Sequence, residues 1–518
     1  MFKSDTFTLE QKIGQIMIIG FDATTMDSGL RRMITEYHIG GVILFARNIE
    51  SPRQVAELTN DLQKTTLESG NPGLFVAIDQ EGGRVARLIE DKGFTEFPSA
   101  MAIGATRYPE NAYRMAAAMA AEMRAVGINV DFAPDLDVNN NPANPVIGTR
   151  SFSPDPNKVA AFGTAFGRGL QANGILAFGK HFPGHGDTGT DSHIDLPLIP
   201  HDRARLNQVE LVPFEAAIAE KFAGIMSAHV TFPAIDPTPG LAATLSRPVL
   251  TGLLREELGY AGLIATDSLE MGALATKGFP PQVGASLALS AGADLLLFNR
   301  DHGMHRAAFA NLVQAVQQER ISEEQLNASV GRILQMKQRF GLLNPVPVEV
   351  EAAVTSVKTV EHLALSRKLA QEAITLLRDP HRLLPLANAN ASIIVETPAM
   401  RDFTKTLGLA ATIFAIDAQP SDTQIGAILH AAQNRSLVIF PIDDLNINTE
   451  QLSLIQKLID RGCPVIVLAH RHPFDAELLP ESATVLVSYG FNPPMREALR
   501  DVLLGKALPL GTFPFTMK

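Results

Sequence analysis

Residues that could carry chemistry are concentrated between positions 180 and 193, in the segment KHFPGHGDTGTDSH. It contains three histidines, two aspartates and three glycines, and the glycines together with Pro183 disfavour both helix and sheet. Imidazole and carboxylate groups at this density suit a phosphate-binding loop, a metal site or a catalytic loop, and a plain polar turn is the fourth alternative. The residues that follow the segment discriminate among the four.

Two of these alternatives fit poorly. Residues 184–189 match G-x-G-x-x-G after a strand-like run, but a dinucleotide site also needs a helix to begin there. The continuation, TDSHIDLPLIP, has two prolines and no helical period. Three histidines, His181, His185 and His193, could ligate a metal ion, but their spacing matches no zinc pattern. We therefore expect neither a nucleotide nor a metal ion at this loop.

A catalytic loop fits better. Asp191 and His193 are two residues apart on an extended segment, so their side chains can lie on the same side. A carboxylate beside an imidazole holds its tautomer and raises its basicity. Asp267, in the segment ATDSLEM, can attack a carbon that bears positive charge in an oxocarbenium-like transition state. These residues predict a proton donor and a nucleophile that act on one bond.

Eight short apolar runs with β character precede position 300, and most are separated by segments with a helical period. They are QIMIIGF, VILFA, LFVAID, INVDFA, ILAFGKH, GIMSAH, LIATD and ADLLLF. Apolar strands that alternate with helices imply parallel strands buried on both faces. Eight such units in roughly 300 residues favour an α/β fold of the (β/α)8 TIM-barrel type over a doubly wound open sheet.

The chain has 518 residues, too many for one ordinary core. A helical pattern ends at Gly341, and the Pro-containing stretch NPVPVEVEA follows. We predict a catalytic barrel over residues 1–345, a linker over 346–356 and a smaller α/β sandwich domain over 357–518. The sandwich region begins with a helical run over 356–377, and its strand candidates are ASIIVE, TIFAI, SLVIF, PVIVLA and TVLVSY.

Polar residues close five of the eight predicted barrel strands. In such barrels the working residues lie at the C-terminal ends of the strands. The polar strand ends are Asp79, Asp131, Asp135, Lys180, His181, His229 and Asp267. One such residue is most often an ordinary turn residue, but five strand ends on one rim indicate a functional site. His470 and His472, far outside the barrel, are interpreted as loop residues.

Composition excludes several classes of partner. The net charge of −11 argues against nucleic acid and against anionic membrane surfaces. The apolar runs have strand length, well below the roughly 20 residues that span a bilayer, and the N-terminus shows no run of signal-peptide length. The single cysteine, Cys463, excludes an internal disulfide and suits a reducing compartment. We expect a cytoplasmic protein, with a monomer favoured, that binds neither nucleic acid nor membrane.

The lack of tryptophan and the presence of only five tyrosines favour a small pocket over an extended sugar-binding cleft. The motifs themselves resemble glycoside hydrolase family 3. Besides the loop at 180–193, the resemblance rests on IDQEGGRVAR (78–87), NPVIGTRSF (144–152) and ATDSLEM (265–271), and it covers the barrel in order. The pattern K-H-x-P-G-x-G-x(4)-D-S-H looks like that of the NagZ-type β-N-acetylglucosaminidases.

The resemblance implies a retaining, exo-acting β-N-acetylglucosaminidase that uses no metal and no organic cofactor. It makes Asp267 the nucleophile, His193 the general acid/base and Asp191 the partner of His193. Five positions match those that hold the N-acetylglucosamine unit, namely Asp79, Arg87, Arg150, Lys180 and His181. Family substrates include cell-wall muropeptide fragments with terminal N-acetylglucosamine, as well as chitin oligosaccharides.

Other functions stay open. A neutral imidazole does not repel phosphate as a carboxylate base would, so a β-N-acetylglucosaminide phosphorylase is an alternative to a hydrolase. A β-glucosidase or xylosidase of the same family is another alternative. The non-enzyme alternative is a sugar-binding protein on a degenerate barrel. Arg87 could instead pair with Glu81, and we expect the second domain to be structural or to shape the entrance.

Overall fold

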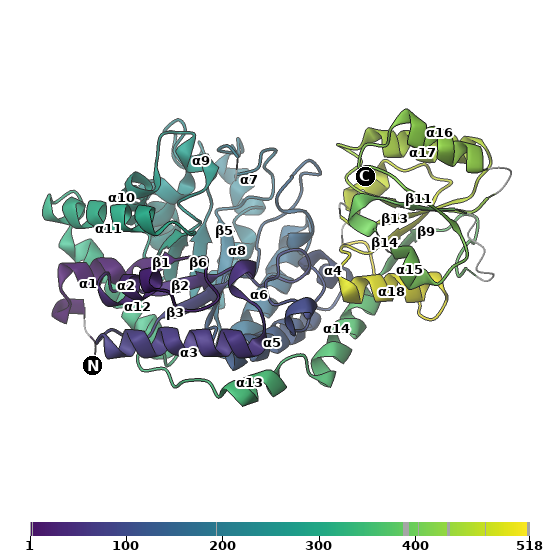
Figure 1. Cartoon of the computed structure of the whole chain (residues 1–518). Helices are drawn as coiled ribbons and strands as arrows, with labels where there is room; N and C mark the ends of the chain where they lie inside the picture. The colour runs from purple at the N-terminus through teal and green to yellow at the C-terminus, as the bar shows by residue number, and fades with distance from the viewer. Residues whose placement is uncertain are drawn as a thin grey trace.

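The computed structural model describes residues 2, 4–192, 194–386, 393–401, 403–432, 436–471 and 473–514. They form a large α/β body, which contains the first sheet, and a smaller one beside it (Figure 1). Among the described helices, none has both the length and the apolar character that a membrane crossing needs.

The first sheet is a closed parallel barrel. Its eight strands lie in the order β7-β6-β5-β4-β3-β2-β1-β8. They are β1 (Met17–Ile19), β2 (Gly41–Leu44), β3 (Phe75–Ile78), β4 (Val130–Asp131), β5 (Leu176–Phe182), β6 (Gly224–Ser227), β7 (Leu263–Thr266) and β8 (Leu296–Phe298). A bridge between Ala265 and Leu295 joins the two ends of the sheet. The predicted (β/α)8 barrel is confirmed.

Helices surround this barrel (Figure 1). They are α1 (Leu9–Gln15), α2 (Ser28–Thr35), α3 (Pro52–Glu68), α4 (Ala100–Ala105), α5 (Pro109–Ala125), α6 (Pro156–Ala172), α7 (Arg203–Gln208), α8 (Val212–Ala219), α9 (Gly272–Ala275), α10 (Pro281–Ala291), α11 (His302–Gln317) and α12 (Glu323–Arg339). A π-helix at Pro248–Glu257 precedes β7. The N-terminus of α3 shows why these segments become helices, because Ser51 caps it by accepting a hydrogen bond from the Gln54 N–H.

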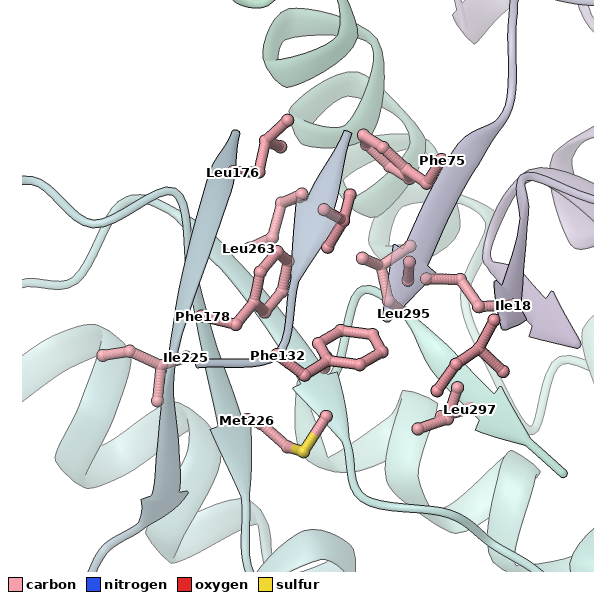
Figure 2. Packing of buried hydrophobic residues seen from close by; sticks show 14 of the residues in the cluster. Ile18, Phe75, Phe132, Leu176, Phe178, Ile225, Met226, Leu263, Leu295 and Leu297 are labelled. Carbon is pink, nitrogen blue, oxygen red and sulfur yellow. The ribbon is translucent and has the colours of Figure 1, made fainter. Parts of the chain in front are cut away.

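Large apolar side chains fill the barrel (Figure 2). Phe132 and Phe178 pack edge to face, with ring centroids 5.3 Å apart and an interplanar angle of 88°. Gly224 on β6 faces the Phe178 ring so closely that an added Cβ would lie 2.0 Å from it. Because side chains alternate along a strand, Lys180 continues the same face of β5 two residues beyond Phe178. The strand that builds the core therefore also carries the lysine to the C-terminal rim.

The second sheet has six strands in the order β11-β10-β12-β13-β14-β9, and only β9 runs antiparallel to its neighbour. The strands are β9 (Thr375–Arg378), β10 (Ile393–Glu396), β11 (Thr412–Ala415), β12 (Val438–Ile442), β13 (Val465–Ala469) and β14 (Thr484–Val487). The accompanying helices are α15 (Phe403–Leu407), α16 (Asp422–Ala431), α17 (Thr449–Asp460) and α18 (Pro493–Leu503). This second α/β layer structure also agrees with the predicted fold class.

One sequence prediction is wrong in its detail. The helical run predicted over 356–377 stops earlier, since helix α14 spans Val360–Ala373 and strand β9 begins at Thr375. The Thr375 hydroxyl oxygen accepts a hydrogen bond from the Tyr489 hydroxyl at 2.9 Å, and Leu376 pairs with Leu486 of β14. Pairing with the edge of the sheet overrides the helical periodicity at this point.

The two bodies are joined by helix α13 (Val350–Ser356) and α14, which run along the outside of the barrel (Figure 1). Arg53 and Glu351 form an ion pair at 2.7 Å that fixes α13 against α3. Further contacts come from the chain end, where the Pro514 carbonyl oxygen accepts hydrogen bonds from Ser153 and Lys158, each at 2.9 Å. The second body therefore sits against the α4–α6 side of the barrel.

We expect Phe178→Ala to destabilise the barrel by about 3–5 kcal/mol, because the truncation opens a cavity that its tightly packed neighbours cannot fill. Denaturant unfolding of the barrel measures this loss. Val346→Ala, at a residue that is 87% exposed, is the control and should change stability by less than about 0.5 kcal/mol. Equal effects of the two substitutions would contradict the packing described for the barrel interior.

Candidate active site

A cavity of about 220 Å³ lies at the C-terminal ends of the barrel strands. It is lined by Ile43, Phe45, Asp79, Val85, Arg87, Val146, Arg150, Lys180, His181, His185, Ser192, Met226, Asp267, Ser268, Met271, Leu297 and Asn299. All of these residues belong to the barrel body, so within the described chain the barrel alone forms the cavity wall.

Four alternating charges form one side of the cavity, and we call Asp79, Lys180, Glu81 and Arg150 the charge chain. Lys180 Nζ lies 2.8 Å from Asp79 Oδ1 and 2.7 Å from Glu81 Oε1. The Arg150 guanidinium binds both Glu81 oxygens at 2.8 Å, a bidentate pair. Arg87 Nη2 lies 3.6 Å from Asp79 Oδ2. The alternative pairing of Arg87 with Glu81 is therefore wrong, because Arg150 and Lys180 occupy that carboxylate.

Two members of the charge chain, Glu81 and Lys180, stay ionised although they are buried. Burial alone would raise the pKa of Glu81, but the charges of Arg150 and Lys180 outweigh it and hold that pKa well below its usual range. Burial likewise opposes the charge of Lys180, yet Asp79 and Glu81 raise the pKa of its ammonium group. These side chains therefore offer fixed ionic hydrogen-bonding groups to a ligand at neutral pH.

Hydrogen bonds to Asp131 and Gln80 hold the loop that carries Asp79 and Glu81. Asp131, at the end of β4, accepts a hydrogen bond from the Gln80 N–H at 2.9 Å. The Gln80 side-chain oxygen in turn accepts hydrogen bonds from the N–H groups of Arg87 and Leu88, at 2.7 and 3.0 Å. Burial raises the pKa of Asp131. Asp131 therefore holds the loop and lies behind the cavity.

We call the segment at 180–193 the histidine loop, and Asp137 holds its first part in place. Its Oδ2 lies 2.7 Å from His181 Nδ1, and its Oδ1 accepts a hydrogen bond from the His185 backbone N–H at 2.6 Å. Burial lowers the pKa of His181 to about 4, so the imidazole is neutral at neutral pH. With the Nδ1 proton donated to Asp137, Nε2 remains an acceptor on the cavity wall, 3.4 Å from Arg150 Nη2.

Asp135 lies beside this pair. Burial, together with the charge of Asp137, raises its pKa to about 8. Asp135, Asp137 and His181 offer ligand atoms within 4.8 Å of one another, a geometry that a metal ion could use. In this structure, however, Asp135 accepts a hydrogen bond from the Asp137 N–H at 2.9 Å and its other oxygen lies 3.6 Å from Arg150. Protein groups therefore bind Asp137, His181 and one oxygen of Asp135, whereas Asp135 Oδ2 has no hydrogen-bond partner among the described residues.

His185 closes the loop on itself. Its Nδ1 lies 2.8 Å from Thr188 Oγ1 and its Nε2 lies 3.0 Å from Ser192 Oγ. Burial lowers the pKa of His185 to about 4. The Asn144 amide donates hydrogen bonds to the carbonyl oxygens of His185 and Gly186, each at 2.9 Å. His185 thus has a structural role as a neutral crosslink.

Close packing holds the rest of the loop. Gly186 approaches Val138 so closely that a Cβ would lie 1.9 Å from the Val138 carbonyl oxygen, which explains the glycine. On the outer side, Asp187 Oδ2 lies 2.6 Å from His201 Nε2. The loop from β5 to Thr188 is therefore fixed on both sides.

The predicted acid/base pair, Asp191 and His193, follows this part in the sequence. His193 lies outside the described residues. Asp191 is half-buried, and its backbone carbonyl accepts a hydrogen bond from the Ile194 N–H at 3.0 Å. The intervening Ser192 is buried, lines the cavity and accepts a hydrogen bond from the Ala273 N–H at 3.2 Å. The segment therefore touches the cavity at Ser192.

Asp267 directly follows β7 and lines the cavity. Burial alone would raise its pKa, but the neighbouring imidazoles of His229 and His181 and the Ser268 N–H, which donates to Oδ1 at 2.7 Å, leave the pKa lowered. His229 lies behind it, with Nε2 2.9 Å from the Ser268 carbonyl oxygen. Asp267 is therefore an ionised carboxylate at neutral pH.

Six predicted residues line the cavity together, namely Asp79, Arg87, Arg150, Lys180, His181 and Asp267. Sequence reasoning missed Asp137 and gave Glu81 no place in the site. The sequence does contain a pattern that could have pointed to each residue. Asp137 is the third acid in DFAPDLD, and Glu81 stands two residues after Asp79. His470 lies in the second body, and His472 is outside the part of the chain that the structure describes.

Comparison with known proteins assigns the barrel to a family. Residues 8–336 match the family described as glycosyl hydrolase family 3 N terminal domain. The chain belongs to glycosyl hydrolase family 3. It is 34% identical to β-hexosaminidase A of Pseudoalteromonas piscicida, an alignment that covers 95% of this chain and 92% of the relative. A β-hexosaminidase of Alkalilimnicola ehrlichii is 39% identical over 54% of this chain and 79% of its own.

Solved structures extend the likeness to both bodies. A family 3 β-N-acetylglucosaminidase from Paenibacillus sp. str. FPU-7 has a TM-score of 0.91 at 40% identity, covering 98% of this chain and 99% of that one. A β-glucoside phosphorylase has a TM-score of 0.83 at 22% identity, which shows a shared fold alone. This family 3 chain is a glycoside hydrolase.

The buried neutral histidines predict a specific pH dependence. Because the pKa of His185 is about 4 in the folded state and about 6.5 in an unfolded chain, the unfolded state binds more protons between these values. The stability that the neutral His185 contributes is complete above pH ~6.5 and is lost as the pH falls toward ~4. We expect His185→Asn to have a lower melting temperature at pH 7 and a smaller further decrease toward pH 4.5.

Melting curves across this pH range measure the effect. His381→Asn, at an exposed histidine, is the matched control and should follow the wild-type pH profile. A wild-type profile in His185→Asn as well would show that His185 is not a buried neutral group.

Proposed function

We propose that this family 3 enzyme is a retaining, exo-acting β-N-acetylglucosaminidase. It removes terminal N-acetylglucosamine from cell-wall muropeptide fragments or chitin oligosaccharides. The proposal rests mainly on Asp267, an ionised carboxylate on the wall of a small cavity. The charge chain lies on the same wall. The β-hexosaminidase relatives, and the β-N-acetylglucosaminidase structure at 40% identity, support the same substrate sugar.

The cavity suits one sugar ring. At about 220 Å³ it is smaller than the pockets that hold drug-sized ligands, which supports exo-action on a terminal unit. Asp79 can accept hydrogen bonds from two sugar hydroxyls, while Lys180, Arg150 and Arg87 donate to hydroxyl oxygens. His181 offers its neutral Nε2 as an acceptor. Because protein contacts already fix most of these groups, they lose little freedom when the sugar binds.

Asp267 is the proposed nucleophile. Its low pKa keeps the carboxylate ionised, and the Ser268 N–H fixes one oxygen. The other oxygen attacks the anomeric carbon as the glycosidic C–O bond breaks, and a covalent glycosyl-enzyme forms. Water then attacks the same carbon from the opposite face of the sugar and releases Asp267, so the configuration is retained.

Proton transfer is assigned to His193, with Asp191 as its partner. His193 donates a proton to the leaving oxygen in the first step and takes one from water in the second. The support from the structure is that Ser192, between these two residues, lines the cavity. Asp191 would stabilise the imidazolium and fix its tautomer.

Three wider statements belong to the same proposal. Hydrolysis, with water as the acceptor, is proposed over phosphorolysis. We also propose a cytoplasmic location, where cell-wall fragments would be recycled. The division into a catalytic barrel at 1–345, a linker at 346–356 and a second domain at 357–518 completes it, and the confinement of the cavity lining to the barrel body supports placing catalysis there.

We expect Asp267→Asn to lower kcat on 4-nitrophenyl N-acetyl-β-D-glucosaminide by roughly four orders of magnitude, because an amide is a poor nucleophile. Steady-state kinetics measure the loss. Asp301→Asn makes the same change at an exposed acid just after β8 and keeps a side-chain oxygen for the helix cap, so it should retain wild-type activity within about twofold. A kcat in Asp267→Asn close to that of the control would refute the assignment of the nucleophile.

A further inference from the structure

Asn299 directly follows strand β8 and lines the cavity that Asp267 lines, yet the proposed function gives it no role. Its Oδ1 is buried and has no hydrogen-bond partner among the residues that the structure describes. Two other lining residues, Arg87 and Ser268, have such an atom, but Arg87 already belongs to the proposed sugar site and Ser268 adjoins Asp267. A buried unpaired oxygen is costly unless a ligand or water donates to it, so the Asn299 amide points to a ligand.

Two neighbouring loops hold the backbone of Asn299. Its N–H donates a hydrogen bond to Glu270 Oε1 at 3.0 Å, and Glu270 belongs to the loop after β7 that also carries Asp267. Its carbonyl oxygen accepts a hydrogen bond from Arg47 Nη2 at 3.2 Å. Gly20 packs so closely on this carbonyl that an added Cβ would lie 1.5 Å from the oxygen. None of these contacts uses the side-chain amide, which is therefore held in place while its Oδ1 stays unpaired.

The cavity wall is charged on one side and neutral on the other. The charge chain follows strands β3, β4 and β5, and Asp267 follows β7 on the opposite part of the barrel. On one side of Asp267, strand β6 contributes the apolar Met226. On the other side, β8 and β2 contribute lining residues among which, in the described chain, Asn299 alone has a polar side chain; the rest are Ile43, Phe45 and Leu297.

The substituents of N-acetylglucosamine can be matched to these two sides. In the proposed mechanism Asp267 attacks C1, so the C3 and C4 hydroxyls, on the far side of the ring, face the charge chain. The C2 acetamido group and the hydroxymethyl group on C5 then extend to either side of Asp267. The acetamido methyl suits the side with Met226, where His181 on the adjacent strand offers Nε2 to the amide N–H. The hydroxymethyl group is left for the side with Asn299.

We propose that Asn299 binds the C6 hydroxyl of the terminal sugar, with Oδ1 accepting the hydroxyl proton, and that it thereby selects sugars that carry a hydroxymethyl group. An asparagine amide suits this partner, because it offers both an acceptor and a donor and a hydroxyl needs both. The inference rests on the proposed function and refines its specificity. A β-xyloside has no C6 and would leave Oδ1 buried and unpaired, so the site disfavours it.

The test removes the hydroxyl and the amide separately and together. The substrates are 4-nitrophenyl N-acetyl-β-D-glucosaminide and its 6-deoxy analogue, which has a methyl group in place of the hydroxymethyl group. The wild type should have the higher kcat/KM on the parent compound. Asn299→Ala should lower the ratio of the two kcat/KM values about tenfold, the loss expected for one buried hydrogen bond, because the variant loses activity mainly on the parent. Asn299→Asp keeps an acceptor oxygen and should retain part of the ratio.

Asn327→Ala is the matched control. Asn327 lies on helix α12 and also has a buried Oδ1 without a partner in the described chain, but it is not among the lining residues of the cavity. This variant should keep the wild-type ratio. Melting temperatures establish that each variant is folded, and if Asn299→Ala does not fold, Asn299→Leu removes both polar atoms at similar size and is measured in the same way.

An unchanged ratio in Asn299→Ala, or an equal loss on both substrates, would overturn the inference. So would a variant whose preference for the N-acetylglucosaminide over 4-nitrophenyl β-D-glucoside falls while the 6-deoxy ratio stays the same, since Asn299 would then contact the acetamido group. Wild-type turnover of the parent compound tests the proposed function separately. Its absence refutes the proposed function, whereas turnover with an unchanged 6-deoxy ratio refutes this inference alone.

Discussion

The proposed active site depends on the burial of Lys180 between two carboxylates. An ammonium group that is only 3% exposed is tolerated because Asp79 and Glu81 compensate its charge. Glu81 is itself shared with Arg150, so its removal would take a counter-charge from two cations at once. Breaking a buried ion pair costs about 3–5 kcal/mol in proteins. The geometry of the charged groups on the cavity wall is therefore set by electrostatics before any ligand enters, and this is the preorganisation that the proposed binding and catalysis need.

The histidine loop obeys a second constraint, which is that its buried polar groups must all be paired. Asp137 forms hydrogen bonds with both the His181 side chain and the His185 backbone N–H. Thr188 and Ser192 lie within hydrogen-bond distance of the two nitrogens of the His185 ring. These bonds explain why a loop rich in glycine and histidine is ordered next to the cavity. Two of its three histidines have structural partners, which leaves His193 for proton transfer in the proposed mechanism.

The strands were predictable because each is a short apolar run between helical segments, a pattern that buried parallel strands require. The end of α14 was not predictable from the sequence. The residues from Thr375 onward continue a helical period and become a strand only because they pair with β14. Asp267 and Lys180 were predictable from their place at strand ends. The role of Asp137 was not, because it depends on how closely β4 and β5 bring their ends together, which a single sequence does not state.

The proposed mechanism requires that Asp267 forms a bond to the sugar while the charge chain holds the ring. Incubation with 5-fluoro-N-acetylglucosaminyl fluoride slows the second step, and mass spectrometry of the digested enzyme then locates the attached sugar. We expect the added mass on the peptide that contains Asp267, and on no peptide in the Asp267→Asn variant. Attachment to any other residue, or turnover with retained configuration and no attachment, would contradict the account.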